Sequence, residues 1–302
     1  MTSYVEAPGG GLSSPTKVIY DDDSSWDWDI AFVLASLHRW IDTEDTDILA
    51  FINSNGQKQS SSVFKIFNDY FEHDITIGEY KGTPVYSVQP WQTNLISVLP
   101  PGDDEFTYPD SDDVYYNALV SAEDSSVAIV QTGFSTALVS FMQTPGGPAL
   151  LKAKVSALYV MGGDYPSREG EFNFAQAPAE ANYLVTNWTT QNGYPPIYFT
   201  GSAFGSSITI GVPDTIDPEV HPAACVGNYK TLTRPGWDMM SLFQGIFGLD
   251  HFTLTAEGTN TVDSVTGDSV FDEETQSGHY YVLSGESVAY YEYRTNWANV
   301  CE

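Results

Sequence analysis

The chain of 302 residues carries 40 acidic and 11 basic side chains, which gives a formal net charge of −29 at pH 7. This charge repels nucleic-acid phosphates and anionic membrane surfaces, so neither is expected as a partner. The hydrophobic content of 42% suffices for a sizeable core, and no apolar run approaches the ~20 residues that a membrane-spanning helix needs.

The start of the chain differs in composition from the rest. Residues 1–16 are rich in Gly, Ser and Pro and are expected to form a flexible arm. They lack the apolar core of a secretory signal. A single domain is expected over residues 17–302.

Three features would suit an extracellular protein: the acidic composition, a glycosylation sequon at Asn187 and a pairing of Cys225 with Cys301. Two cysteines in a long chain define neither a zinc site nor a disulfide framework. The sequence therefore leaves both the pairing and the compartment open.

The first half of the chain alternates between strand-like and helix-like segments. Short apolar runs predict strands, and apolar residues three and four positions apart predict helices. Strands are expected at 18–20, 47–52 and 83–87, and helices at 30–40, 61–71 and 114–122. Residues 89–113, rich in Pro, Asp and Gly, are expected to form a long loop.

The alternation continues in the second half. Strands are expected at 127–130, 155–160 and 197–200, and helices at 135–143, 180–188 and 237–247. The last fifty residues are rich in Thr, Tyr, Val and Gly and are expected to form β-hairpins. This order predicts an α/β fold, with a central mostly parallel sheet flanked by helices and a β-rich C-terminal addition.

Five carboxylates crowd into nine residues between the first strand and the first helix: Asp21, Asp22, Asp23, Asp27 and Asp29. Such crowding is costly unless a cation lies among the carboxylates. A solvated acidic loop is the alternative. The stretch follows the carboxyl end of a strand, where α/β folds place their sites, and this favours a site. Asp22 is expected to face solvent or the edge of the core, without a role.

Three other loops are expected at the same edge of the sheet, because the carboxyl ends of parallel strands meet there. They contain Asn53 and Asn55, Thr132 with Gly133, and Gly162 with Gly163.

Five motifs, in this order, resemble those of the nucleoside hydrolase family, calcium-dependent enzymes that cleave the N-glycosidic bond of ribonucleosides. The resemblance covers roughly residues 17–295. The motifs are Asp21-x-Asp23-x-x-x-Asp27-x-Asp29, Thr132-Gly133, Val160-Met161-Gly162-Gly163 followed by Glu171-Phe172-Asn173, Pro196-Ile197-Tyr198-Phe199-Thr200-Gly201, and Arg234-Pro235-Gly236-Trp237-Asp238.

The resemblance implies a calcium site. Asp23 would ligate calcium and act as general base on the attacking water, and Asp29 or Asp27 would be another ligand. The carbonyl of Thr132 and the carboxylate of Asp238 would complete the protein's share. Calcium takes six to eight oxygen ligands, so this donor set is of the right kind.

The resemblance also implies a site for a small nucleoside or riboside. Glu171 and Asn173 match the positions that hold the sugar hydroxyls, and Asn53 or Asn55 would assist. Relatives often form dimers or tetramers, so a homo-oligomer is also expected.

Two departures from the family pattern bear on activity. The opening motif of relatives usually ends in two adjacent aspartates, whereas Ile30 follows Asp29 and Trp28 follows Asp27. Many relatives have a histidine, which protonates the leaving base, where this chain has Trp237. Trp cannot serve as a general acid, although its face can stack on a base.

The leading hypothesis is therefore a calcium-dependent N-ribohydrolase. The alternative is a catalytically degenerate scaffold with a binding, structural or assembly role. A third hypothesis, a carbohydrate-binding module, rests on the 7 Trp and 19 Tyr residues.

Overall fold

The computed structural model describes residues 16–102, 107–166 and 170–300, without the side chains of residues 297–300. The predicted N-terminal arm lies outside the described residues except for Thr16, and Cys301 of the predicted pair also lies outside them. Cys225 is buried.

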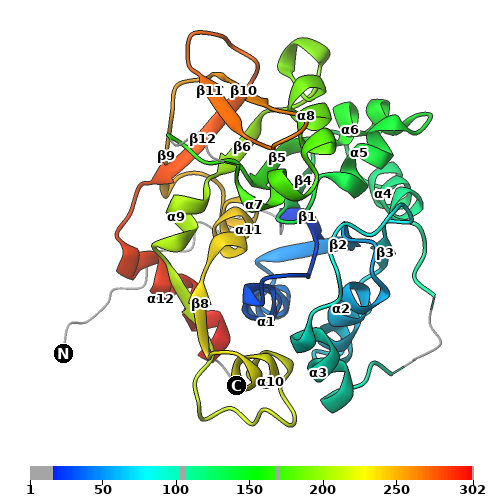
Figure 1. Ribbon diagram of the computed structural model, residues 1–302, viewed down its shortest axis with the longest axis vertical. Helices are drawn as coiled ribbons and strands as arrows, with labels where there is room; N and C mark the ends of the chain where they lie inside the picture. The colour runs from blue at the N-terminus through cyan, green and yellow to red at the C-terminus, as the bar shows by residue number, and fades with distance from the viewer. Residues whose placement is uncertain (1–15, 103–106, 167–169, 301–302) are drawn as a thin grey trace.

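An eight-stranded sheet forms the centre of the molecule (Figure 1). Its first seven strands are parallel, and only the last one at the edge is antiparallel to its neighbour. The mostly parallel sheet is therefore confirmed. In spatial order the strands are β3 (Ile77–Glu79), β2 (Thr46–Asn53), β1 (Thr16–Asp22), β4 (Val127–Gln131), β5 (Val155–Met161), β6 (Ile197–Thr200), β12 (His279–Ser284) and β9 (Phe252–Leu254).

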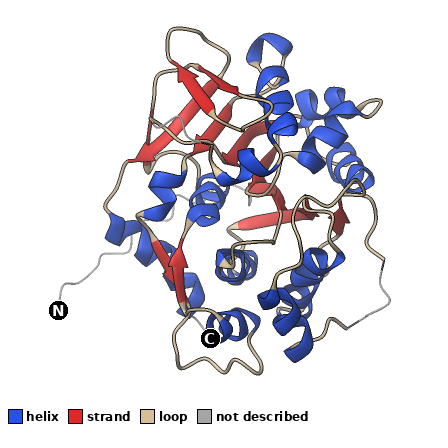
Figure 2. Ribbon diagram, viewed as in Figure 1, coloured by secondary structure: helices blue, strands red, loops and turns tan. Residues whose placement is uncertain are grey.

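Helices cover both faces of this sheet (Figure 2). Along β1, Val18 and Tyr20 pack into one core and Ile19 packs into the other, because successive side chains of a strand point to opposite faces. The first core is completed by α1 (Asp29–Asp42), α2 (Lys58–Tyr70), α3 (Pro90–Val98), α10 (Pro222–Tyr229), α11 (Trp237–Phe247) and α12 (Val288–Val300). The second is completed by α4 (Ser111–Val120), α5 (Thr136–Gln143), α6 (Gly147–Lys154) and α8 (Pro178–Asn187).

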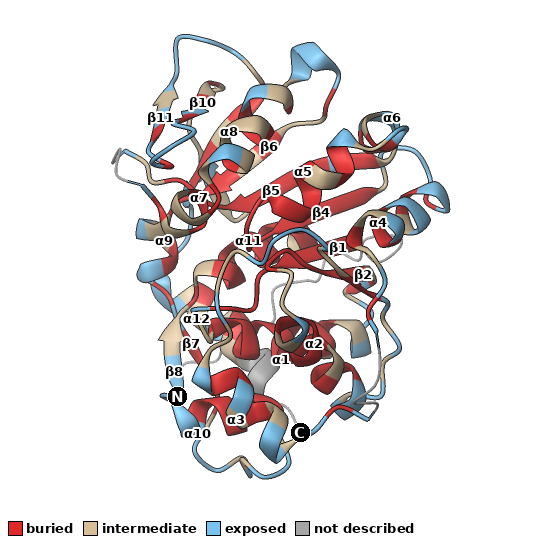
Figure 3. Cartoon of the chain, turned by 45° about the vertical axis from the view of Figure 1, so that its right-hand side comes forward, coloured by how far each residue is buried: buried red, intermediate tan, exposed pale blue. Residues whose placement is uncertain are grey.

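The two-sided burial explains the composition of the central strands. Every residue of β4 is buried, and most of β1 and β5 is buried as well (Figure 3). Parallel strands covered on both faces read as continuous apolar runs, which is why the sequence pattern located them.

The prediction for residues 83–113 was wrong in two places. The third strand is β3, at Ile77–Glu79, whereas the segment 83–87 is largely exposed and contains Pro84, which cannot donate a hydrogen bond to a sheet. The predicted loop at 89–113 contains α3 and the start of α4. Pro90 suits the first turn of α3, and Gln89 forms a reciprocal capping box with Gln92.

The C-terminal part is rich in strands, as expected, but its arrangement differs from hairpins alone. β10 (Thr259–Val262) and β11 (Ser269–Asp272) form an antiparallel pair, whereas β12 enters the main sheet beside β6. The chain then forms α12, which the strand-prone composition had hidden. Tyr291 on α12 is fully buried, and Ser36 of α1 donates a hydrogen bond to the Thr295 carbonyl. Tertiary packing therefore overrides local propensity here.

The remaining elements are short: α7 (Phe172–Gln176), a 3-10 turn (Thr190–Asn192), α9 (Ser202–Ser206), β7 (Thr209–Gly211) and β8 (Thr233–Pro235). β7 and β8 pair with each other beside the main sheet. Over the described ranges, every helix falls short of the length and apolarity required to cross a membrane.

Candidate active site

A cavity of about 440 Å³ opens at the carboxyl ends of the central parallel strands. This volume suits a small-molecule ligand. Its wall includes the acidic loop after β1, Thr132 after β4, and Met161 at the end of β5. Three of the four loops expected at this edge therefore line the cavity. The fourth, after β2, also reaches this edge, because the Ser54 backbone N–H donates to the Asp22 carbonyl at 3.0 Å, but it does not line the cavity.

The end of β1 separates the first two aspartates. Asp22 continues the face of Val18 and Tyr20 and lines the cavity, whereas Asp21 lies on the opposite face. The Tyr115 hydroxyl donates a 2.6 Å hydrogen bond to Asp21, and burial raises the pKa of Asp21 to about 8. Asp21 is therefore a buried support beneath the cavity.

Asp22, which had been expected to have no role, is 2% exposed and central. It accepts hydrogen bonds from the Thr132 hydroxyl at 2.7 Å and from the Ser24 backbone at 2.6 Å. Burial raises its pKa to about 6, although bonds from Thr132, Ser24 and Asp238 oppose the shift. Strand alternation was the sequence signal that could have identified Asp22.

Asp23 also lines the cavity, one residue beyond the strand. One of its carboxylate oxygens accepts hydrogen bonds from both the backbone and the hydroxyl of Ser25. Burial, followed by the charge of Asp22, raises its pKa well above the usual range. A Cβ on Gly133 would collide with the Asp23 backbone nitrogen, so glycine lets the two loops meet.

The acidic loop is held from behind by α3. The Trp91 indole donates to the Ser25 carbonyl at 2.9 Å, and the Gln92 amide donates to the Ser24 carbonyl. Ser24 has a positive φ of 43°, which costs energy for a residue other than glycine. The helix α3, which the sequence pattern did not predict, therefore fixes the strained loop that carries the carboxylates.

Asp29 and Asp238 stand in the first turns of α1 and α11. Helix N-termini favour negative charge, which partly explains how two buried carboxylates can be tolerated. The Asp238 backbone nitrogen lies 3.4 Å from an Asp29 carboxylate oxygen. Burial raises the pKa of both groups well above the usual range. The charges of Asp27 and Asp22 raise the pKa of Asp29 further, and the charge of Asp29 raises that of Asp238.

Asp27 is engaged differently from Asp29. The Arg234 guanidinium grips its two carboxylate oxygens at 2.7 and 2.9 Å. The guanidinium also lies 4.0 Å from the centre of the Trp28 ring. Asp27 and Asp29 were the two alternative calcium ligands. Asp27 is neutralised by Arg234, whereas Asp29 remains beside Asp238.

Glu171 and Asn173 meet the cavity at the start of α7. Glu171 caps this helix by accepting from the backbone of Asn173 at 3.0 Å and of Phe174 at 3.2 Å, and burial raises its pKa to about 7. The Asn173 amide donates to the Thr132 carbonyl at 2.7 Å. The amide oxygen of Asn173 is left for a ligand.

The structure does not bring Asn53 or Asn55 into the cavity wall. Asn53 donates to the Gln57 carbonyl and the Ser61 hydroxyl and accepts from the Asn55 backbone. Asn55 accepts from the Tyr86 backbone at 2.7 Å. Both side chains form hydrogen bonds that stabilise the loop after β2. The expectation that Asn53 or Asn55 helps to bind the sugar therefore has no support in this arrangement.

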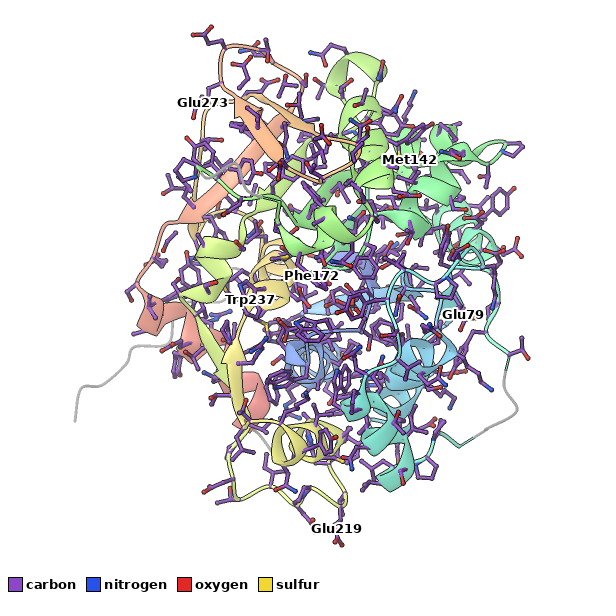
Figure 4. All side chains as sticks on the ribbon, in the orientation of Figure 1. Glu79, Met142, Phe172, Glu219, Trp237 and Glu273 are labelled. Carbon is purple, nitrogen blue, oxygen red and sulfur yellow. The ribbon has the colours of Figure 1, made fainter. Side chains whose placement is uncertain are left out.

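Aromatic rings border the cavity, and sequence reasoning had selected only one of them. Figure 4 shows Phe172 and Trp237 in the middle of the molecule, and both line the cavity together with the half-exposed Trp26. The Trp237 N–H donates to the Ser202 carbonyl and the Ser206 hydroxyl, both of α9. Trp237 therefore offers the cavity a ring surface.

The donor chemistry fits a divalent cation. Asp22, Asp29 and Asp238 are carboxylates whose pKa values are raised above all by burial, and hard oxygen donors of this kind suit calcium. As they stand, however, no three His, Cys, Asp or Glu side chains within the described ranges form a ready-made metal site. A cation would have to draw these carboxylates together.

Neither a protein-family model nor a curated protein matches the sequence. Solved structures match it over nearly its whole length. A plant nucleoside hydrolase aligns with a TM-score of 0.73 and 13% identity, over 95% of this chain and 100% of its own. For a purine-preferring ribonucleoside hydrolase from Gardnerella vaginalis the TM-score is 0.69, with 13% identity and coverage of 94% and 98%.

The type III effector protein XopQ, solved in complex with adenosine diphosphate ribose, aligns with a TM-score of 0.68 and 13% identity, over 95% of this chain and 92% of its own. Likeness at such low identity establishes the fold. Together with the sheet order and the cavity at its carboxyl edge, these alignments confirm the resemblance seen in the motifs: the chain has a nucleoside hydrolase-like fold.

Proposed function

We propose that this protein hydrolyses the N-glycosidic bond of ribonucleosides or related N-ribosides with a calcium-held water. The observation that supports this most directly is the set of buried carboxylates, Asp22, Asp29 and Asp238, that line one cavity together with Thr132. The similar structures are nucleoside hydrolases by name, and one is solved with a ribose-containing ligand.

The metal would be held by Asp22, Asp29 and Asp238 with the Thr132 carbonyl. When bound, calcium would act as a Lewis acid that lowers the pKa of water and orients the sugar hydroxyls. Asp23 is the proposed proton acceptor. Both hydrogen bonds from Ser25 end on the same carboxylate oxygen of Asp23, which leaves the other oxygen for the attacking water.

The sugar would lie between this acidic cluster and α7. Asn173 presents its amide oxygen to a sugar hydroxyl because its N–H group is bound to Thr132. Glu171 is locked by the backbone of α7 and can accept from a second hydroxyl. As the C–N bond breaks, the anomeric carbon gains oxocarbenium character, which nearby carboxylates stabilise.

One observation favours the second candidate, a degenerate scaffold that binds without turnover. Asp27 is committed to Arg234, so one acidic residue of the opening motif is withdrawn from the cluster. Such a protein would bind a riboside without consuming it.

Ribose release distinguishes these functions. Chelator-treated protein is assayed with a mixed nucleoside pool and with 4-nitrophenyl β-D-ribofuranoside, whose leaving group needs no proton. We expect release that appears with calcium and disappears with chelator. Absence of both calcium binding and release would reject the hydrolase and favour the scaffold.

A further inference from the structure

The leaving group sets a chemical demand on this cavity. When an N-glycosidic bond breaks, its electron pair goes to the ring nitrogen of the base. A neutral purine or pyrimidine then departs as an anion unless a side chain donates a proton to it. An N-quaternised base, which already carries a positive charge, departs as a neutral molecule and needs no donor.

Histidine, the commonest proton donor in enzymes, is absent from the cavity. All 5 histidines of the chain lie at described positions, and none of them lines it. They are engaged elsewhere: His38 with His73, His221 at the start of α10, His251 near Glu286, and His279 with the Trp188 carbonyl.

The aromatic side chains among the described lining residues do not replace it. The Trp237 N–H is bound to α9, and no tyrosine of the described chain lines the cavity. Both oxygens of Glu171 accept backbone N–H groups, from Asn173 to one and from Gly163 and Phe174 to the other. Burial raises the pKa of Glu171 to about 7 although these bonds oppose the shift, and the bonds commit both oxygens to backbone groups of Gly163 and the start of α7.

The charge of the wall favours a cationic ligand. Among the described lining residues, Arg234 is the only cation and seven residues carry a carboxyl group: Asp22, Asp23, Asp27, Asp29, Asp164, Glu171 and Asp238. Arg234 is itself paired with Asp27. The rings of Trp26, Phe172 and Trp237 add faces that attract a flat cation.

We infer that the cavity selects N-ribosides whose leaving base is already cationic, such as pyridinium or N7-alkylated purine ribosides. This inference rests on the proposed function. The water oxygen bonds to the anomeric carbon as the C–N bond breaks, and the bond's electron pair neutralises the ring nitrogen. Asp23 takes the water proton and passes it to solvent. The products are ribose, a neutral heterocycle and one proton.

Guanosine and 7-methylguanosine test this directly, because they differ by one methyl group and one positive charge. A working proton donor would erase most of the difference in leaving ability between them. Without a donor, kcat/KM for 7-methylguanosine should exceed that for guanosine by at least about a hundredfold, the lower range of general-acid contributions.

The reporter 4-nitrophenyl β-D-ribofuranoside separates the ways in which this test can fail. If the reporter is cleaved and guanosine lies within about tenfold of 7-methylguanosine, a proton donor operates. The inference is then overturned and the proposed function stands. If neither nucleoside nor the reporter is cleaved, the proposed function fails and the inference falls with it.

Binding provides a readout that needs no turnover. We expect 1-methylnicotinamide, a cation, to quench tryptophan fluorescence at lower concentration than neutral nicotinamide. Asp164→Asn should weaken the binding of the cation severalfold and leave nicotinamide unchanged. Asp263→Asn, on the exposed turn between β10 and β11, is the matched control. Equal affinity for the two ligands would overturn the inference.

Discussion

The side-chain amide of Asn173 donates a 2.7 Å hydrogen bond to the backbone carbonyl of Thr132. This bond links the segment proposed to bind the sugar with a carbonyl proposed to hold the metal. A carbonyl oxygen has two lone pairs, so it can accept the amide and still ligate a cation. The proposed metal site and the proposed sugar site would thereby be joined through one atom.

Removal of this amide should weaken calcium binding. In Asn173→Ala the Thr132 carbonyl loses the donor that orients it, and loss of such a supporting contact typically reduces metal affinity by about 10- to 100-fold. Calorimetric titration of chelator-treated protein measures the change. The exposed Asn192→Ala serves as control. Unchanged affinity in Asn173→Ala would show that Thr132 does not hold the metal.

The pairing of Asp27 with Arg234 should contribute to stability. Both side chains are about a quarter exposed, so we expect Arg234→Met to lower the free energy of unfolding by about 1–2 kcal/mol. Urea denaturation of Arg234→Met, Asp27→Asn and the double variant measures the coupling. If the two single effects simply add in the double variant, the pair makes no specific contribution.

Acid should destabilise the protein through His38. Burial, followed by the charge of His73, lowers the pKa of His38 to about 3. His38, His73 and Asp42 form a cluster, in which His73 contacts both His38 and the carboxylate of Asp42. The unfolded chain takes up a proton below pH 6.5 and the folded chain does not, so stability falls between about pH 6.5 and 3, by up to about 1.4 kcal/mol per pH unit.

Urea unfolding at a series of pH values tests this slope. His38→Phe keeps a ring in the stack against Phe71 and should flatten the slope. His251→Gln, a histidine outside the cluster, is the comparison variant. A wild-type slope in His38→Phe would assign the acid sensitivity to other groups.

Calcium should stabilise the folded protein. A cation that binds only the native state adds about 2.7 kcal/mol at a concentration of a hundred times Kd. Asp238→Asn should lose this gain, and without metal it should be at least as stable as the wild type, because it removes one repelling buried charge. Thermal unfolding with calcium and with chelator measures both effects. If the thermal unfolding midpoint of the wild type does not change when calcium is added, the metal assignment is contradicted.

The parts of the fold that follow from local patterns could be predicted. Short continuous apolar runs identified β1, β4 and β5, and parallel topology brought their carboxyl ends together. Pairings between distant segments could not be predicted, because no local pattern records that β12 lies beside β6. α12 was hidden for a similar reason, since its stability comes from packing on α1.

The site shows the same limit at single-residue scale. The motifs located the acidic loop, but they did not show which aspartates point into the cavity together. The choice of Asp22 over Asp21 depends on strand alternation, and the withdrawal of Asp27 depends on Arg234, more than two hundred residues away. Only the folded chain brings these partners together.

The division of labour between Asp22 and Asp23 is the central claim, and one assay tests it most directly. Calcium-dependent cleavage of 4-nitrophenyl β-D-ribofuranoside is measured for Asp22→Asn and Asp23→Asn, together with calcium affinity. We expect Asp22→Asn to lose calcium binding, and Asp23→Asn to keep it while kcat falls by about 10²- to 10⁴-fold. Full activity in Asp23→Asn, or intact calcium binding in Asp22→Asn, would contradict the account.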